Sequence, residues 1–158
     1  MSNFESQIID TWNIHNRINL FMIENIPEEA FKATLSTRGG RNISRQLAHV
    51  NNVRVWRLKP FAKKISENLI EFEKEESPGK KKLIKAFRQS SEVMEKYFRY
   101  CLQNNFEVSN FKRGVLPMLG YYISHEAHHR GNILLTMKKS GFPLSDALKW
   151  EIWDWNEI

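Results

Sequence analysis

The amino-acid sequence predicts an all-α protein, an up-down four-helix bundle with a short additional helix at the C-terminus. Four long segments carry apolar residues three and four positions apart, the spacing that places them on one face of a helix. Turn-forming residues separate these segments, and no stretch shows the sustained alternation of a half-buried strand. Long helices joined in this way are typical of a helical bundle.

The first helix is expected over about residues 3–25. Pro27 closes it, because proline removes a backbone N–H and clashes with the preceding turn of a helix. Residues 37–40, with the sequence TRGG, form a loop. The residues that recur at helical spacing along this helix are Phe4, Ile8, Trp12, His15, Ile18 and Met22.

The second helix begins near Asn42 or Ser44, which are both favoured N-cap residues. Pro60 is expected to end or kink this helix, although residues 61–65 could continue it beyond the kink. Residues 66–77 then form an acidic connector. The apolar face of the second helix consists of Ile43, Leu47, Val50 and Val53.

The third helix is expected over about residues 80–103, and two asparagines at 104–105 stop it. The fourth begins near Pro117, a residue type that is favoured in the first turn. It ends at residues 140–143, where glycine and then proline stop a helix. A short aromatic helix follows within residues 144–155.

The composition is that of a single domain spanning residues 1–158. With 41% hydrophobic residues, a chain of this length can bury a core without help from a metal or a disulfide. No apolar run approaches the roughly 20 residues that span a bilayer, and the N-terminus lacks the pattern of a secretory signal. Cys101 is the single cysteine, which excludes an intramolecular disulfide and favours a cytoplasmic location. No basic pattern or base lies near it at a recognisable spacing, so we expect a buried, unreactive thiol rather than a nucleophile.

The chain is basic, with a net charge of +6 and a pI near 9.5, which raises the question of an anionic partner. Its lysines are spread out, and a solvated helix face accounts for the densest run, at residues 80–82. No zinc-finger spacing or aromatic RNA-binding motif accompanies them. A nucleic-acid partner is therefore disfavoured.

Three of the five histidines lie in the segment HEAHHRGN, residues 125–132. His125 and His129 are four positions apart on the fourth helix, so both side chains can reach one point. His129 shares its side of the helix with apolar residues, whereas His128 points to a more polar strip. We therefore expect His125 and His129 to face inward together, and His128 to lie at the surface or behind the site.

Two histidines on one helical turn make a weak site, because zinc sites take three or four protein ligands. His49, on the flank of the apolar face of the second helix, is the candidate third ligand, with a neutral core histidine as the alternative. Bundles build metal sites from facing helices, which favours the ligand role. His15 is expected to make surface or polar contacts, with a role as reserve ligand or supporting residue as the alternative.

His49 and the segment 125–132 together resemble the signature of the DinB-like (YfiT-like) metal-binding four-helix bundles. In that family a histidine on the second helix joins an HxxxHRGQ-type motif on the fourth. The segments WNIHNRI at 12–18 and ISRQLAHVNNV at 43–53 also resemble the family, so the likeness covers nearly the whole chain. Asn132 stands where the family usually has glutamine, which carries the same amide on a longer side chain.

The resemblance implies a divalent metal ion held by His49, His125 and His129, with water or substrate completing its coordination. Zinc or nickel is expected first, with iron, manganese or cobalt as alternatives. An ion held by three neutral imidazoles can lower the pKa of a bound water toward about 7, or keep a thiol deprotonated. The implied function is a small-thiol S-transferase or a hydrolase with a small-molecule substrate.

Several neighbouring residues have more than one interpretation. Glu126 and Arg130 have the spacing of an ordinary intrahelical ion pair; alternatively, Arg130 steadies an anionic substrate. Gly131 is expected to let another helix approach closely. The C-terminal tryptophans pack over the bundle end, form a dimer contact or cover the metal, and the resemblance implies a homodimer. These tryptophans are Trp150, Trp153 and Trp155.

The sequence leaves three classes of function open. They are a metal-dependent enzyme, a non-enzymatic metal-binding protein associated with stress, and a basic nucleic-acid-binding protein. Three ligands with an open coordination position favour a reactive site, whereas a fourth protein ligand would favour a structural one. We therefore rank the metal-dependent enzyme first, the non-enzymatic metal-binding protein second and the nucleic-acid-binding protein third.

Overall fold

A computed structural model describes residues 3–65, 68–105 and 111–157, without the side chains of residues 62–65. Over these ranges the chain is helical and has no strand, as predicted. None of the helices described is long and apolar enough to cross a membrane. The long helices are α1 (Asn3–Asn25), α2 (Ile43–Ile65), α3 (Lys80–Gln103) and α4 (Val115–Lys139), and the short elements are the 3-10 helices Glu28–Lys32 and Glu151–Trp153 and the helix α5 (Asp146–Lys149).

Local sequence signals determine where α2 begins, and packing determines how far it continues. The Oδ1 atom of Asn42 accepts a hydrogen bond of 2.8 Å from the backbone N–H of Arg45, so Asn42 is the N-cap residue. The helix then continues through Pro60. Just beyond the proline, Phe61 is buried, with its ring centroid 4.8 Å from that of Tyr97. This packing offsets the backbone hydrogen bond that the proline removes.

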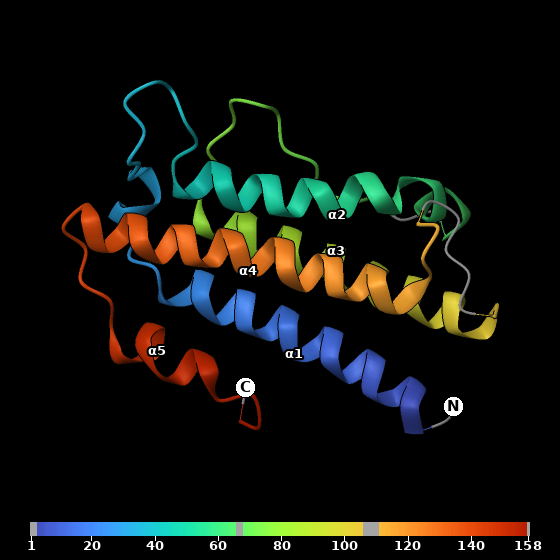
Figure 1. The fold of residues 1–158 in the computed structure, drawn as a ribbon. Helices are drawn as coiled ribbons and strands as arrows, with labels where there is room; N and C mark the ends of the chain where they lie inside the picture. The colour runs from blue at the N-terminus through green and yellow to red at the C-terminus, as the bar shows by residue number, and fades with distance from the viewer. Residues whose placement is uncertain (1–2, 66–67, 106–110, 158) are drawn as a thin grey trace.

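The four long helices do not alternate strictly in direction (Figure 1). α1 and α4 run one way, whereas α2 and α3 both run the other way, so the predicted up-down order fails between α2 and α3. The reason lies in the length of the connector between them. Residues 66–79 can span up to roughly 46 Å when extended, and α2, with 23 residues, is only roughly 35 Å long. The connector can therefore return the chain to the end of the bundle where α2 began.

The described part of this connector, residues 68–79, runs back along α2. The side chain of Asn52 donates to the carbonyl of Phe72 at 2.8 Å and accepts from its N–H at 2.9 Å. Nearer the start of α2, the hydroxyl of Ser44 donates to the carbonyl of Pro78 at 2.6 Å. Residues later in the connector contact residues earlier in α2, so the described part of the connector packs antiparallel to α2, and Phe72 is buried.

The interior is divided into two apolar clusters with a polar layer between them. The first cluster includes Phe87 and the second includes Phe98. In α1, Trp12 belongs to the second cluster and Ile18 to the first, and His15 lies between them. The other long helices follow the same order of apolar, polar and apolar residues. The buried side chains of the polar layer include His15, Asn16, Asn19, Arg54, Ser90, Ser91 and Glu126.

The C-terminal segment lies beside α1 (Figure 1). Leu148 and Ile152 are buried against the first apolar cluster. Trp150 and Trp153, in contrast, are 71% and 74% exposed. The short helix predicted over 144–155 is a four-residue α5 followed by a 3-10 turn, and it presents indole rings to solvent while its aliphatic residues pack inward.

Candidate metal centre

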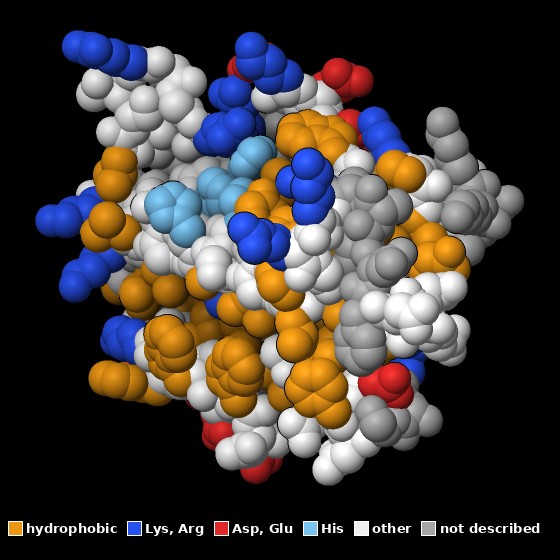
Figure 2. Space-filling view, turned by 45° about the vertical axis from the view of Figure 1, so that its right-hand side comes forward, with side chains coloured by type: hydrophobic (Ala, Val, Ile, Leu, Met, Phe, Trp, Pro, Cys, Tyr) orange, Lys and Arg blue, Asp and Glu red, His pale blue; other side chains and the backbone are white. Residues whose placement is uncertain are grey.

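The three predicted ligands come together between α2 and α4. One nitrogen from each of His49, His125 and His129 lies within 4.8 Å of the other two. The ring centroid of His49 lies 5.5 Å from that of His125 and 5.1 Å from that of His129, and the last two are 4.8 Å apart. All three side chains are half-buried, and Figure 2 shows histidine side chains gathered at the surface beside basic ones. This three-histidine cluster could hold one metal ion.

Helix geometry and aromatic neighbours position the three rings. His125 and His129 are one turn apart on α4, and α2 carries His49 to the facing side. Tyr121 stacks on His125, with ring centroids 5.8 Å apart and an angle of 10° between the planes. Trp56 meets His49 edge-on, with a centroid distance of 6.3 Å. These contacts restrict rotation of the imidazoles and hold their nitrogens near one another.

The surroundings keep the three imidazoles in the neutral form that binds metals. Partial burial, then the positive charge of Arg41 and the neighbouring His125, lower the pKa of His49 to about 4. Burial and the other histidines lower the pKa of His129 to about 4. Burial also lowers the pKa of His125. At pH 7 each ring therefore keeps one unprotonated nitrogen with a lone pair for coordination.

The donor atoms of the cluster fit a divalent metal ion. The Nδ1 atoms of His125 and His129 are buried and have no hydrogen-bond partner among the described residues. Buried polar atoms are normally paired, so these two nitrogens are available for another ligand. Imidazole nitrogens are common ligands of zinc, nickel and related ions. Three of them leave at least one coordination position for water or substrate.

A groove of about 280 Å³ opens beside His49, between α2 and the connector. The indole of Trp56 forms part of its wall, and its charged side chains come from α2, from the connector and from Arg41 in the loop before α2. Both signs of charge are present next to the cluster, which suits a small molecule that carries both. The charged residues that line the groove are Arg41, Arg45, Glu71, Glu73, Lys74 and Glu76.

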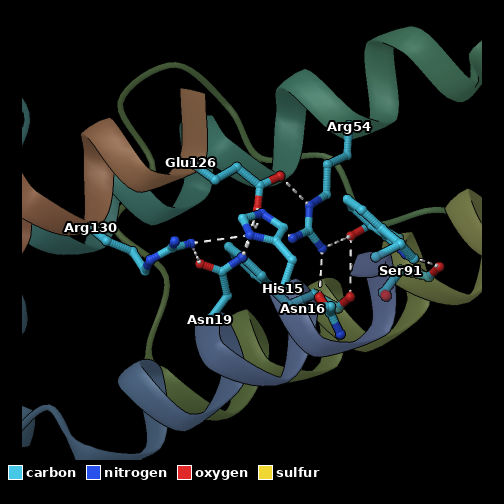
Figure 3. Close-up of polar contacts among 10 residues, drawn as sticks. His15, Asn16, Asn19, Arg54, Ser91, Glu126 and Arg130 are labelled. Atoms are coloured by element: carbon cyan, nitrogen blue, oxygen red, sulfur yellow. Dashed lines mark hydrogen bonds and ion pairs between the residues drawn. The ribbon is translucent and has the colours of Figure 1, made fainter. Parts of the chain in front are cut away.

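Glu126 forms the centre of the polar layer, next in sequence to His125 (Figure 3). Its carboxylate accepts hydrogen bonds from Nε and Nη2 of Arg54 at 2.8 and 2.6 Å. His15 Nε2 and Asn19 Nδ2 lie 2.8 and 2.6 Å from the same carboxylate. These contacts join α1, α2 and α4 through charge-assisted hydrogen bonds.

The carboxylate of Glu126 is ionised in this layer. Burial alone would raise its pKa, but the guanidinium of Arg54, followed by His15, outweighs burial and holds the pKa of Glu126 well below its usual range. Burial lowers the pKa of His15 against the attraction of Glu126, so the imidazole is neutral at pH 7. Because Nε2 of His15 faces the carboxylate, we assign the ring proton to Nε2, which leaves Nδ1 as an acceptor.

The predicted ion pair between Glu126 and Arg130 is not formed. Arg54 reaches Glu126 from α2 and contacts both carboxylate oxygens. Arg130 instead donates from Nη1 to Oδ1 of Asn19 at 2.8 Å and lies 3.5 Å from Nδ1 of His15. Of the roles expected for His15, the polar contact and the supporting role agree with the structure: His15 is not at the surface but fully buried in the polar layer, with its Nε2 2.8 Å from Glu126. Arg130 and His15 thus lie on the α1 side of α4.

Three further expectations have clear outcomes. His128 is exposed, as predicted, and its Nε2 lies 3.0 Å from the amide nitrogen of Asn132. Gly131 does not serve a close helix contact, because a Cβ placed there would meet nothing within 4 Å. Cys101 is buried, and burial raises its pKa to about 11, which agrees with a spectator thiol.

Sequence reasoning missed Arg54 and Asn19 as members of this site. A signal for Arg54 was present, since it lies four residues after Val50 and four before Leu58 on the apolar face of α2. A charged side chain in such a stripe is buried only when a partner faces it. The partner comes from α4, 72 positions further along the chain, so only the fold identifies it.

Comparison with known proteins adds one assignment. The DinB family profile matches residues 1–146, which include the four long helices and the three clustered histidines. No match was found among the curated proteins or among the solved structures. The chain therefore belongs to the DinB family.

Proposed function

We propose that this chain is a divalent-metal-dependent enzyme that uses His49, His125 and His129 as ligands and transfers a small thiol. The observation that carries the proposal is the cluster of three neutral imidazoles beside an open groove. A bound divalent ion would supply Lewis acidity, which lowers the pKa of a thiol or water that reaches it. Zinc or nickel is the proposed ion, with iron, manganese and cobalt as alternatives.

In the proposed transfer, the sulfur of the thiol forms a bond to an electrophilic carbon of the second substrate. The leaving group departs with the bonding electron pair, and the thiol proton passes to solvent. The groove residues would orient a small thiol that carries ammonium and carboxylate groups, since Arg41 and Lys74 supply positive charge and Glu73 supplies negative charge. The indole of Trp56 offers an apolar wall for the second substrate.

Hydrolysis is the second candidate activity at the same cluster. A hydrolase gains from a general base near the reacting water. Glu126 is the carboxylate nearest to the ligands in sequence, but its oxygens are bound by Arg54 inside the polar layer. Glu126 is therefore not free to accept a proton on the groove side. Thiol transfer makes less demand on such a base, because the thiolate is itself the nucleophile.

Elemental analysis of untagged protein tests the metal site first. We expect about one divalent ion per chain in the wild type, and its loss in His49→Ala and in His129→Ala. His128→Ala is the matched control, because His128 lies on the same helix turn but is exposed and lies outside the cluster. An ion content that is the same in all four proteins would contradict the ligand assignment.

The metal-loaded protein would then be assayed with a panel of low-molecular-weight thiols and an alkyl or aryl halide, and separately with ester and amide substrates. Thiol transfer that is lost in His129→Ala and kept in His128→Ala would support the proposal. Metal binding without turnover in either panel would favour a non-enzymatic metal protein. If no ion binds and the protein instead shifts DNA in a salt-dependent gel assay, the basic-surface alternative would replace the metal site.

A further inference from the structure

A second cavity, of about 170 Å³, lies between α1, α4 and the C-terminal segment. We call it the tail cavity. It shares no lining residue with the groove beside His49. Figure 2 shows hydrophobic side chains gathered below the histidines on this face of the molecule. The residues that line the tail cavity are Ile18, Ala127, Arg130, Gly131, Leu134, Ile152, Trp153 and Trp155.

Arg130 is the charged residue of this lining, and its charge is not neutralised within the polar layer. Two guanidinium groups, those of Arg54 and Arg130, lie near one carboxylate, that of Glu126, and only Arg54 is hydrogen-bonded to it. The contacts of this carboxylate are already made by Arg54, His15 and Asn19. His15 is neutral because burial lowers its pKa. The layer therefore carries one excess positive charge, at the wall of the tail cavity.

Arg130 also has unused hydrogen-bond donors. Its Nη1 donates to Asn19 Oδ1, but Nε and Nη2 make no hydrogen bond to any other described residue. A guanidinium is a planar fork of five donors that matches a carboxylate. Burial beside apolar walls strengthens such a contact, because water screens it less. An anionic group is the ligand chemistry that completes this arrangement.

The other residues that line the tail cavity indicate the size and polarity of the rest of the ligand. Ile18 and Ile152 are buried aliphatic residues, and Trp153 and Trp155 add indole surface. Gly131 contributes no side chain, and a Cβ there would meet nothing within 4 Å. A volume of about 170 Å³ lies below the range of about 300–1,000 Å³ that is typical for drug-sized ligands. The ligand is therefore small and largely apolar.

We propose that the tail cavity binds a small monocarboxylate with an apolar body, either a short-chain or an aromatic acid. The carboxylate accepts hydrogen bonds from Arg130, and the apolar body lies against Trp153 and Trp155. The proposal does not depend on the metal site, because the two sites are lined by different residues. It also gives a role to the tryptophan-rich C-terminal segment, which closes one side of the cavity.

Hexanoate is a suitable probe, because it does not absorb where tryptophan is excited. Titration of chelator-treated protein should give a saturable change in tryptophan fluorescence, and calorimetry should give the same dissociation constant. The chelator ensures that the acid cannot bind through a metal ion. The neutral analogue hexan-1-ol should bind roughly tenfold more weakly, the ratio expected for one charge-assisted hydrogen bond. Equal binding of acid and alcohol would overturn the role of Arg130.

Four variants locate the binding site. Arg130→Gln should bring acid and alcohol to about equal affinity, and Arg130→Lys should restore part of the preference for the acid. Gly131→Leu should fill the cavity and abolish binding of both probes, whereas Gly120→Leu, at an open position on the same helix, should leave binding unchanged. Binding that survives Gly131→Leu would overturn the proposal, and thermal melts of each variant would show that it folds.

Another cavity could bind the acid instead, and a different tryptophan in its wall allows the two sites to be told apart. A shallower cavity of about 690 Å³ is lined by Lys138, Lys149 and Trp150 but not by Trp155. Trp155→Phe should remove much of the fluorescence response to hexanoate, and Trp150→Phe should not. The opposite result would place the acid at the two lysines and overturn the proposal.

Discussion

Arg54 and Glu126 are the residues that align the two helices carrying the histidines. Arg54 lies five positions after His49 on α2, and Glu126 is adjacent to His125 on α4. The guanidinium of Arg54 also lies 4.8 Å from the ring centroid of Trp12. A buried pair with two short hydrogen bonds tolerates little sliding of one helix along the other. The pair therefore fixes the position of α2 along α4 such that the ring nitrogens of His49, His125 and His129 lie close together.

Glu126→Gln should lower the free energy of unfolding by about 3–5 kcal/mol, because the guanidinium of Arg54 would stay buried without a countercharge. The measurement is urea unfolding at pH 7 in the presence of a chelator. The control is Glu95→Gln, which removes a partly exposed pair with Arg99 four residues away, and which should cost no more than about 0.5 kcal/mol. Similar losses in the two variants would mean that the buried pair is no more important than the surface pair.

The pKa values of His49 and His129 predict how the stability of the metal-free protein depends on pH. Both are about 4 in the folded protein, against about 6.5 in an unfolded chain. Between these values the unfolded chain binds more protons, so the free energy of unfolding falls as pH drops from 6.5 toward 4 and levels off above 6.5. Urea unfolding across this window measures the slope.

Carboxylates also titrate near pH 4, so the comparison requires a variant. His49→Gln combined with His129→Gln should show a clearly smaller loss of stability between pH 6.5 and 5 than the wild type. His15 contributes in the same direction in both proteins, since burial lowers its pKa too. Identical slopes in the two proteins would contradict the lowered pKa values.

At the scale of the elements, the sequence predicted the helices better than it predicted how they are connected. Apolar spacing, Asn42 as N-cap and the residues after α3 and α4 placed the helix ends closely, because these signals are local. The direction of α3 was not predictable in this way. It depends on the path of residues 68–79, whose main anchors are side-chain amides on α2 rather than a periodic pattern of their own.

Asn52→Ala should release this connector from α2. It removes two hydrogen bonds to the backbone of Phe72 and leaves both buried backbone groups without their partners, so the loss should be about 2 kcal/mol or more. Hydrogen exchange at the amide of Phe72 should accelerate more than exchange in α1. Asn104→Ala, which removes an exposed side-chain contact at the end of α3, should change stability by no more than about 0.5 kcal/mol. Unchanged exchange at Phe72 would show that other contacts hold the connector.

At the scale of the whole molecule, the layered interior explains which parts of the candidate site the sequence could indicate. The three histidines were predicted from a short motif and a resemblance. In the structure, one ring nitrogen of each lies within 4.8 Å of the other two. The polar layer behind them joins residues more than 100 positions apart, as His15 and Glu126 do. Local patterns carry no information on such pairs, so the partners of Glu126 and Arg130 became visible only in the fold.

A metal ion that bridges α2 and α4 should stabilise the whole bundle, because the unfolded chain does not hold the three ligands together. At a free zinc or nickel concentration of 100 times the dissociation constant, the free energy of unfolding should rise by about 2.7 kcal/mol. Thermal melts with and without the ion measure this effect. His128→Ala should keep the gain and His129→Ala should lose it. A gain in both variants would point to binding elsewhere on the chain.

The burial of Cys101 has a consequence for following motion in this molecule. The thiol lies in the second apolar cluster, is fully buried and has a pKa of about 11. A thiol-directed reagent therefore reacts with it only after that half of the bundle has opened. The rate of labelling in native buffer thus reports how often the second apolar cluster opens to solvent. Because the chain has a single cysteine, this rate can be measured on the wild-type protein without an engineered label.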